Sequence, residues 1–219
     1  MANLVWDATG QHFYETGVDH GTIWVGDAGT AVAWNGLTSV SEAPEGAEAN
    51  PLYADNIKYL NLISAEDFGF SINAYTYPEE FEACDGLASP EAFVTIGQQS
   101  RTKFGFYYRT KVGNDVDGDK KGYKHHFIYN CTAAPSSKDY ATVNDSPEAI
   151  EFSWEVDTLP VTFSYGTPAV EYSTATVTID DSKMTTANKT AFQTWLDGVL
   201  DDGATMPAPS AVLTAASAW

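Results

Sequence analysis

The stretch TKFGFYYRTKVGNDVDGDKKGYKHHFIYNC, residues 102–131, decides the fold. In its first half, Phe104, Phe106 and Tyr108 alternate with more polar side chains, so one face of an extended strand is apolar. Its second half, YKHHFIYNC, is rich in aromatic residues, which favour strands. A polar link containing glycine joins the halves, and this arrangement predicts a β-hairpin.

The link of this hairpin is also a weak candidate for calcium binding. Its three carboxylates recur at every second position: Asp115, Asp117 and Asp119. An EF-hand loop needs glycine at its sixth position and glutamate at its twelfth, but in either reading frame one of these positions holds a lysine. His125 and His126 are adjacent in the return strand and point to opposite faces, so we do not expect them to bind one metal ion.

The rest of the chain predicts a mainly β protein, a β-sandwich or partial barrel. Short aromatic and β-branched runs are separated by Gly, Pro, Asn and Asp, which is typical of these folds. The clearest run is AIEFSWEVD, residues 149–157, in which Ile150, Phe152, Trp154 and Val156 form an apolar face. The opposite face consists of Glu151, Ser153, Glu155 and Asp157.

Two segments predict helices. Apolar residues at helical spacing indicate one main α-helix over about residues 186–201, flanking the β-structure. A second, short helix is expected over about residues 78–85, where Pro78 suits the first turn and three glutamates complement the helix dipole.

Two further segments lack either pattern. Residues 39–55 are rich in Glu, Ala, Pro and Gly and are predicted to be a long loop, and residues 204–219 are predicted to be an arm or disordered. We therefore expect one β domain over residues 1–203, with an N-terminal arm, followed by a C-terminal tail.

The charge of the chain limits its partners. Thirty acids face eleven bases, which gives a net charge of -19. This charge repels DNA and anionic membranes, so sequence-specific DNA binding and membrane binding are not expected. No apolar run approaches the ~18 residues that a membrane span requires.

The basic residues are concentrated around the hairpin. Seven of the eleven lie there: Arg101, Lys103, Arg109, Lys111, Lys120, Lys121 and Lys124. On so acidic a chain, such a band could pair with the acidic surface of a neighbouring copy in a head-to-tail contact. The alternative is a solvated strand face.

No catalytic motif is present in the sequence. Glu79 and Glu80 could serve a glycosidase, but acids so close together rarely act as opposed acid and base, and we favour a negatively charged helix start as their explanation. Cys84 and Cys131 are expected to be buried thiols, with a single disulfide bridge as the alternative.

Several tyrosines could form a platform on which sugar rings stack. They are Tyr75, Tyr77, Tyr107 and Tyr129. Tyrosine is also enriched in protein cores and subunit interfaces. We favour a core or interface position for these residues over a sugar-binding platform.

Three runs carry a resemblance to a known family: YADNIKYLNL (53–62), AYTYPEEFEACDG (74–86) and VNDSPEAIEFSWEV (143–156). In this order and at similar separations, they resemble the major tail proteins, or tail tube proteins, of long-tailed bacteriophages. The resemblance covers roughly residues 12–203.

This resemblance implies a structural virion protein with no enzymatic activity and no cofactor. Hexameric rings of such proteins stack into a tube that encloses the tape-measure protein, meets tail terminator and tail tip proteins, and conducts genomic DNA. The resemblance places the chain in the virion tail, assembled in the host bacterial cytoplasm.

Two site hypotheses follow from the resemblance. Glu151, Ser153, Glu155 and Asp157 are predicted to line the lumen, because an acidic wall would not bind passing DNA. The 39–55 loop and the N-terminal arm are predicted to contact the adjacent ring, through Glu42, Glu45, Glu48, Tyr53 and Asp55. The alternatives are a carbohydrate-binding β-sandwich module assisted by calcium, and an acidic glycosidase domain.

Overall fold

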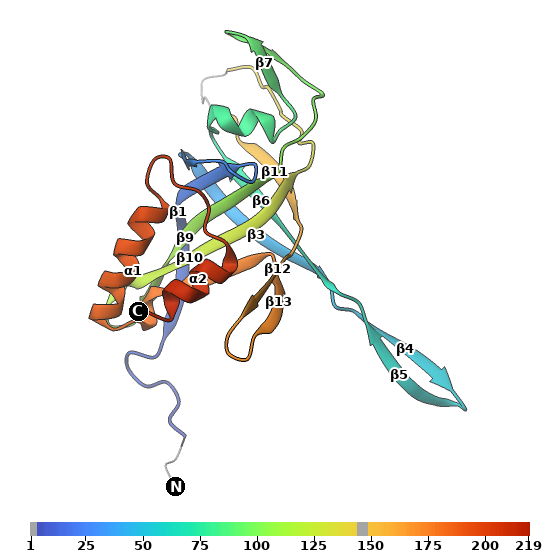
Figure 1. Cartoon of the computed structure of the whole chain (residues 1–219), viewed down its shortest axis with the longest axis vertical. Helices are drawn as coiled ribbons and strands as arrows, with labels where there is room; N and C mark the ends of the chain where they lie inside the picture. The colour runs from blue at the N-terminus through green and yellow to red at the C-terminus, as the bar shows by residue number, and fades with distance from the viewer. Residues whose placement is uncertain (1–3, 144–148) are drawn as a thin grey trace.

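The computed structural model describes residues 4–143 and 149–219, so the first part of the run 143–156 lies outside it. Its main sheet has the strand order β2-β1-β9-β10-β11-β6-β3, with β14 also paired to β10 (Figure 1). These strands are β1 (Phe13–Val25), β2 (Ala31–Trp34), β3 (Leu37–Gly46), β6 (Glu66–Ala74), β9 (Phe104–Asn114), β10 (Gly118–Ala133), β11 (Phe152–Thr158) and β14 (Thr176–Asp180). The predicted mainly β class and the central hairpin, now β9–β10, are confirmed.

The sheet curls because its two ends are joined by a very short connection. β2 and β3 stand at opposite ends of the strand order, yet only Asn35 and Gly36 separate them in sequence. Gly36 has a φ of 83°, and a Cβ there would meet Thr76 Cγ2 at 2.8 Å. Only glycine suits this turn, and the turn forces the sheet into the predicted partial barrel.

The inside of the barrel is an aromatic core. Trp34 packs against Phe81 and Trp154, with ring centroids 4.5 and 5.5 Å away. Phe81 comes from η1 (Glu79–Ala83), a 3-10 helix at the position of the predicted short helix. Cys84 and Cys131 lie in this core as free buried thiols, as expected, and burial raises the pKa of Cys84 to about 12.

Two helices cover the outer face of β1, β9, β10 and β14. The predicted flanking helix is α1 (Thr186–Val199), and it buries Phe192, Leu196 and Val199. Thr185 caps it by accepting a hydrogen bond from the Asn188 backbone N–H. The second helix, α2 (Pro209–Ala216), packs into the same outer core. None of the helices within the described ranges is long and apolar enough to cross a membrane.

The C-terminal tail differs from its prediction. Residues 204–219 form neither a separate arm nor a disordered tail, because α2 buries Val212 and the Ala204 carbonyl accepts hydrogen bonds from the Ala31 backbone N–H (2.8 Å) and the Trp24 indole (3.1 Å). The domain therefore continues past residue 203. The composition of Ala, Ser and Pro did not predict a helix here. The short apolar side of α2 is stabilised by its packing against the outer core.

The predicted 39–55 loop is also wrong. These residues form most of β3 and all of β4 (Ala49–Ala54), which pair with β6 and with β5 (Ile57–Ile63). Pairing with neighbouring strands stabilises the extended conformation of these residues, which their own sequence pattern does not predict. β4 and β5 project from the barrel as a hairpin, residues 49–63, which we call the arm (Figure 1).

Two smaller hairpins also extend from the barrel (Figure 1). They are formed by β7 (Ala88–Glu91) with β8 (Val94–Ile96), and by β12 (Val161–Tyr165) with β13 (Val170–Thr174).

Replacing Trp154 should test the barrel core. Its side chain is fully buried against Trp34 and Phe81. We expect Trp154→Ala to lower the free energy of unfolding by ~3–5 kcal/mol, because a large cavity remains. Urea denaturation followed by circular dichroism measures the change. Tyr59→Ala, on the exposed arm, is the control and should change stability by less than ~0.5 kcal/mol.

Candidate functional site

The outer surface of β11, β6 and β3 is a continuous acidic face. Along each strand, residues of this face alternate with residues of the core. Trp154 of β11 pairs with Ile72 of β6 on the inside, and Glu155 pairs with Ser71 on the outside. Its members are Ser153, Glu155, Asp157, Asp67, Gly69, Ser71, Asn73, Ser39, Ser41, Ala43 and Glu45. We call these residues the acidic face.

The acidic face carries four carboxylates and no basic residue. Glu155, Asp157, Glu45 and Asp67 line one hollow on the three strands. Small and polar side chains fill the spaces between them. The charged side chains of the face therefore all have one sign, which repels polyanions, and the face has no basic side chain that could bind them.

The structure brings three of the four predicted lumen residues together. Ser153, Glu155 and Asp157 lie on the acidic face, whereas Glu151 precedes β11 and accepts a hydrogen bond from the Thr38 hydroxyl. Sequence reasoning missed Asp67 and assigned Glu45 to the contact with an adjacent ring instead. The alternation in DFGFSINA, residues 67–74, is a signal that could have identified Asp67 and Ser71.

The arm exposes apolar side chains on a hairpin that stands free of the barrel. Every residue of β5 is exposed. The exposed apolar side chains are Leu52, Tyr53, Ile57, Tyr59, Leu60, Leu62 and Ile63. An isolated two-stranded hairpin is marginally stable in water, and a contiguous exposed apolar surface marks an interaction site.

The predicted inter-ring residues divide between different surfaces. Tyr53 and Asp55 lie at the tip of the arm, Glu48 lies between β3 and β4, and Glu45 belongs to the acidic face. Glu42 is exposed and accepts a hydrogen bond from the Tyr108 hydroxyl at 2.6 Å, and its contact with an adjacent ring stays a prediction. It sits opposite Phe70, on the inward-facing set of β3 positions.

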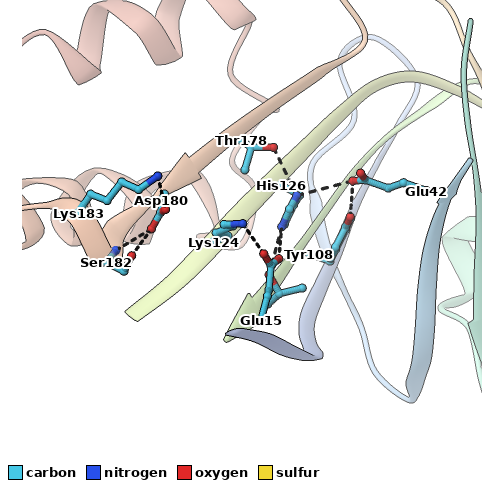
Figure 2. A network of polar contacts seen from close by, with 10 residues as sticks. Glu15, Glu42, Tyr108, Lys124, His126, Thr178, Asp180, Ser182 and Lys183 are labelled. Carbon is cyan, nitrogen blue, oxygen red and sulfur yellow. Dashed lines mark hydrogen bonds and ion pairs between the residues drawn. The ribbon is translucent and has the colours of Figure 1, made fainter. Parts of the chain in front are cut away.

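Glu42 belongs to a polar network at one end of the barrel interior (Figure 2). The His126 ring stacks on Tyr108 with centroids 4.5 Å apart. Its two ring nitrogens lie 3.7 Å from carboxylate oxygens of Glu15 and Glu42. Lys124 and the Thr110 hydroxyl donate hydrogen bonds to Glu15. The network joins β1, β3, β9 and β10 where the apolar core ends.

The environment of the network shifts two pKa values. Burial lowers the pKa of His126, although Glu42 and Glu15 act against this shift. Burial would raise the pKa of Glu15, but hydrogen bonds from Lys124 and Thr110 outweigh it and the pKa is lowered. The network therefore favours a neutral imidazole beside an ionised Glu15 carboxylate. His125 points the other way, against Phe192, as the alternation predicted.

The seven basic residues of the hairpin region do not form one exposed band. Five of them pair with acids of the same chain: Arg101 with Asp85, Arg109 with Asp19, Lys111 with Asp119, Lys121 with Asp117, and Lys124 with Glu15. Lys103 and Lys120 are exposed. Five of the positive charges thus have a partner within the subunit, and the contact of these residues with a neighbouring copy stays a prediction.

The three aspartates of the β9–β10 link have roles within the chain. The Gly10 backbone N–H donates to the Asp115 carboxylate at 3.0 Å, and the His12 backbone N–H donates at 3.3 Å. Hydrogen bonding from Gly10 holds the pKa of Asp115 at about 2. In the part of the chain that the structure describes, no group of three or more His, Cys, Asp or Glu side chains could hold a metal ion.

Among the described residues, the tyrosines predicted as a sugar platform are not exposed together, and the two glutamates predicted for a glycosidase are neighbours on one turn. Tyr107 and Tyr129 are buried and Tyr77 packs against the core, so only Tyr75 of the proposed sugar platform is exposed. Glu79 and Glu80 are side by side in the first turn of η1, as a negatively charged helix start predicts.

Neither a protein-family model nor a curated protein sequence matches the chain. Among solved structures, the chain is similar to the SPP1 tail tube, with 13% identity, a TM-score of 0.41, and coverage of 76% of this chain and 78% of that chain.

Two further structures are similar to the chain. The first is the anti-feeding prophage baseplate, with 7% identity, a TM-score of 0.40, and coverage of 83% of this chain and 100% of that chain. The second is the PVC sheath–tube complex of an extracellular contractile injection system, with 9% identity, a TM-score of 0.32, and coverage of 80% and 94%. At these identities the likeness concerns the fold alone.

Replacing Asp115 should release the segment that precedes β1. Asp115→Asn removes the charge that the Gly10 and His12 backbone N–H groups bind. We expect hydrogen exchange at these two amides to accelerate severalfold while exchange in the barrel is unchanged, because the contact is local. Unchanged exchange at both amides would show that the carboxylate does not anchor this segment.

The stability of the protein should depend on pH through His126. Because folding lowers the pKa of His126, its contribution to stability is present above the unfolded value of about 6.5 and is lost as pH falls through the folded value. Glu15 acts at lower pH, since its stabilisation is lost only below the ordinary glutamate pKa of about 4.3.

The variant His126→Phe separates these two effects. Phenylalanine can keep the stack on Tyr108 but does not titrate. We expect urea unfolding to lose less stability between pH 7 and about pH 5 in the variant than in the wild type. An equal loss of stability in both proteins would show that groups other than His126 cause the pH dependence.

Proposed function

We propose that this chain is the structural subunit of a bacteriophage tail tube. In this proposal, hexameric rings of the chain stack into a tube that encloses the tape-measure protein and ends at terminator and tip proteins. Genomic DNA passes through the lumen without sequence-specific binding. The subunit has no catalytic role, and it resides in the tail of the virion after assembly in the host cytoplasm.

The observation that carries this proposal is the acidic face. A wall facing DNA must not bind phosphates, because a basic surface would bind them through counterion release. The acidic face presents Glu155, Asp157, Glu45 and Asp67 without any lysine or arginine. We therefore assign this face to the lumen, together with Ser153.

The distribution of apolar surface supports self-assembly. Copies with a net charge of -19 repel one another, so a stable assembly needs apolar contacts between them. The arm supplies such a surface, with Tyr53 71% exposed and Tyr59 68% exposed. The resemblance of the runs 53–62 and 74–86 to tail tube proteins points to the same class of assembly.

Accessibility of an introduced cysteine tests the placement of the acidic face. Negative-stain microscopy of the concentrated chain should first show rings or tubes. We expect Glu155→Cys to react with a bulky polymer-linked maleimide in the disassembled chain and to be protected in tubes, because the reagent cannot follow the lumen. The native cysteines are buried and should stay unreactive in both states.

Asp197→Cys is the matched control, since Asp197 is exposed on α1, which covers a different part of the barrel. It should react in both states. Equal labelling of the cysteine at position 155 in tubes and subunits would place the acidic face on the outer wall. Absence of rings and tubes at any concentration would contradict the proposed function itself.

A further inference from the structure

The connection between β2 and β3 contains the only Asn–Gly pair of the chain, Asn35–Gly36. Both residues are exposed. An asparagine that precedes glycine can lose its side-chain amide in water, because the backbone nitrogen of the glycine can attack the side-chain carbonyl carbon. Glycine favours this ring closure, since it has no Cβ to obstruct the approach. The connection that closes the barrel is thus also a candidate site of covalent modification.

The two reacting groups of this pair are not held by hydrogen bonds. Among the described residues, neither the Asn35 side chain nor the Gly36 backbone N–H has a hydrogen-bond partner. Asn114 differs, because its side-chain carbonyl accepts hydrogen bonds from the backbone N–H groups of Val116 (3.2 Å) and Asp117 (2.6 Å). The Asn35 side chain is therefore free to turn toward the nitrogen that would attack it, whereas that of Asn114 is held in place.

The fold itself requires glycine at position 36. The φ of Gly36 is 83°, and a Cβ there would lie 2.8 Å from Thr76 Cγ2. Hydrogen bonds on either side of the pair hold the connection to the chain after β6. The Trp34 indole N–H donates to the Thr76 carbonyl at 2.8 Å, and the Tyr75 backbone N–H donates to the Gly36 carbonyl at 2.9 Å. The glycine that the barrel needs is therefore the residue that makes the preceding asparagine reactive.

We propose that Asn35 is a site of spontaneous deamidation in the folded protein, and that its isoaspartate product weakens the closure of the barrel. The Gly36 nitrogen forms a bond to Asn35 Cγ, and the bond from Cγ to Nδ2 breaks, so ammonia leaves with the proton of the Gly36 nitrogen. Water then opens the resulting succinimide ring. Attack of water at Cγ leaves aspartate at position 35, and attack at the main-chain carbonyl leaves isoaspartate, in which the chain runs through Cβ and Cγ.

The two products should affect the barrel differently. Isoaspartate adds a methylene group to the backbone between Trp34 and Gly36, in a connection of only two residues that joins the ends of the main sheet. This lengthening displaces the Gly36 carbonyl from the Tyr75 N–H, so the sheet ends should separate more easily. Aspartate adds only a charge at an exposed position and should change stability little. The reaction takes place within one chain and does not depend on self-assembly.

Ageing of the purified full chain in mildly alkaline buffer tests the site. We expect peptide mapping by mass spectrometry to show deamidation severalfold faster at Asn35 than at Asn114, whose side chain is held and which precedes Asp115 rather than glycine. Labelling with an isoaspartyl methyltransferase should locate isoaspartate in the peptide that contains position 35. An Asn35 that stays unmodified in the folded chain, while it reacts in a sample unfolded in urea, would overturn the inference.

Urea unfolding tests the consequence for the barrel. The aged wild type should contain a fraction that unfolds at a lower urea concentration, and this fraction should grow with the isoaspartate content. Asn35→Ser removes the reacting amide and should keep its urea midpoint through the same ageing. Fresh Asn35→Asp carries the added charge without the added methylene group and should unfold like the wild type. An isoaspartate-containing chain with an unchanged midpoint, or an equal loss in aged Asn35→Ser, would overturn the proposed weakening.

Discussion

The short connection between β2 and β3 is the constraint on which the rest of the structure depends. Asn35 and Gly36 join the two ends of the main sheet, so the sheet must curve until those ends approach. The space thus enclosed is filled by the aromatic rings around Trp34 and Trp154. Closure also decides that one set of alternating side chains is buried and the other faces outward.

The outward set then divides into two regions because β10 changes partners along its length. Its residues 124–128 pair with β14, and residues 131–133 pair with β11, with Asn130 at a φ of 50° at the change. α1 and α2 cover the region around β14. The region around β11 keeps its acidic side chains on the surface, which leaves one face available for a functional role.

The sequence predicted the strands and the helix correctly where apolar residues recur at one regular spacing, because that spacing determines which side chains are buried. The alternation at residues 104–108 and 150–157, and the helical spacing that ends at Val199, were each read from local pattern alone. It failed for β3, β4 and α2, whose partners are distant strands or a sheet surface. It could not identify the acids that pair with Arg109 and Lys124, because these lie 90 and 109 positions away. Long-range pairing leaves no local signature.

The structure as a whole separates charge from apolar surface. Many bases pair with acids of the same subunit, four carboxylates without a base line one face, and apolar side chains project on the arm. Reconstruction by cryo-electron microscopy of tubes formed by the purified full chain tests this separation most directly. We predict a density in which Glu155 and Asp157 face the lumen and the arm contacts another subunit. Tubes with these carboxylates on the outer wall would contradict it.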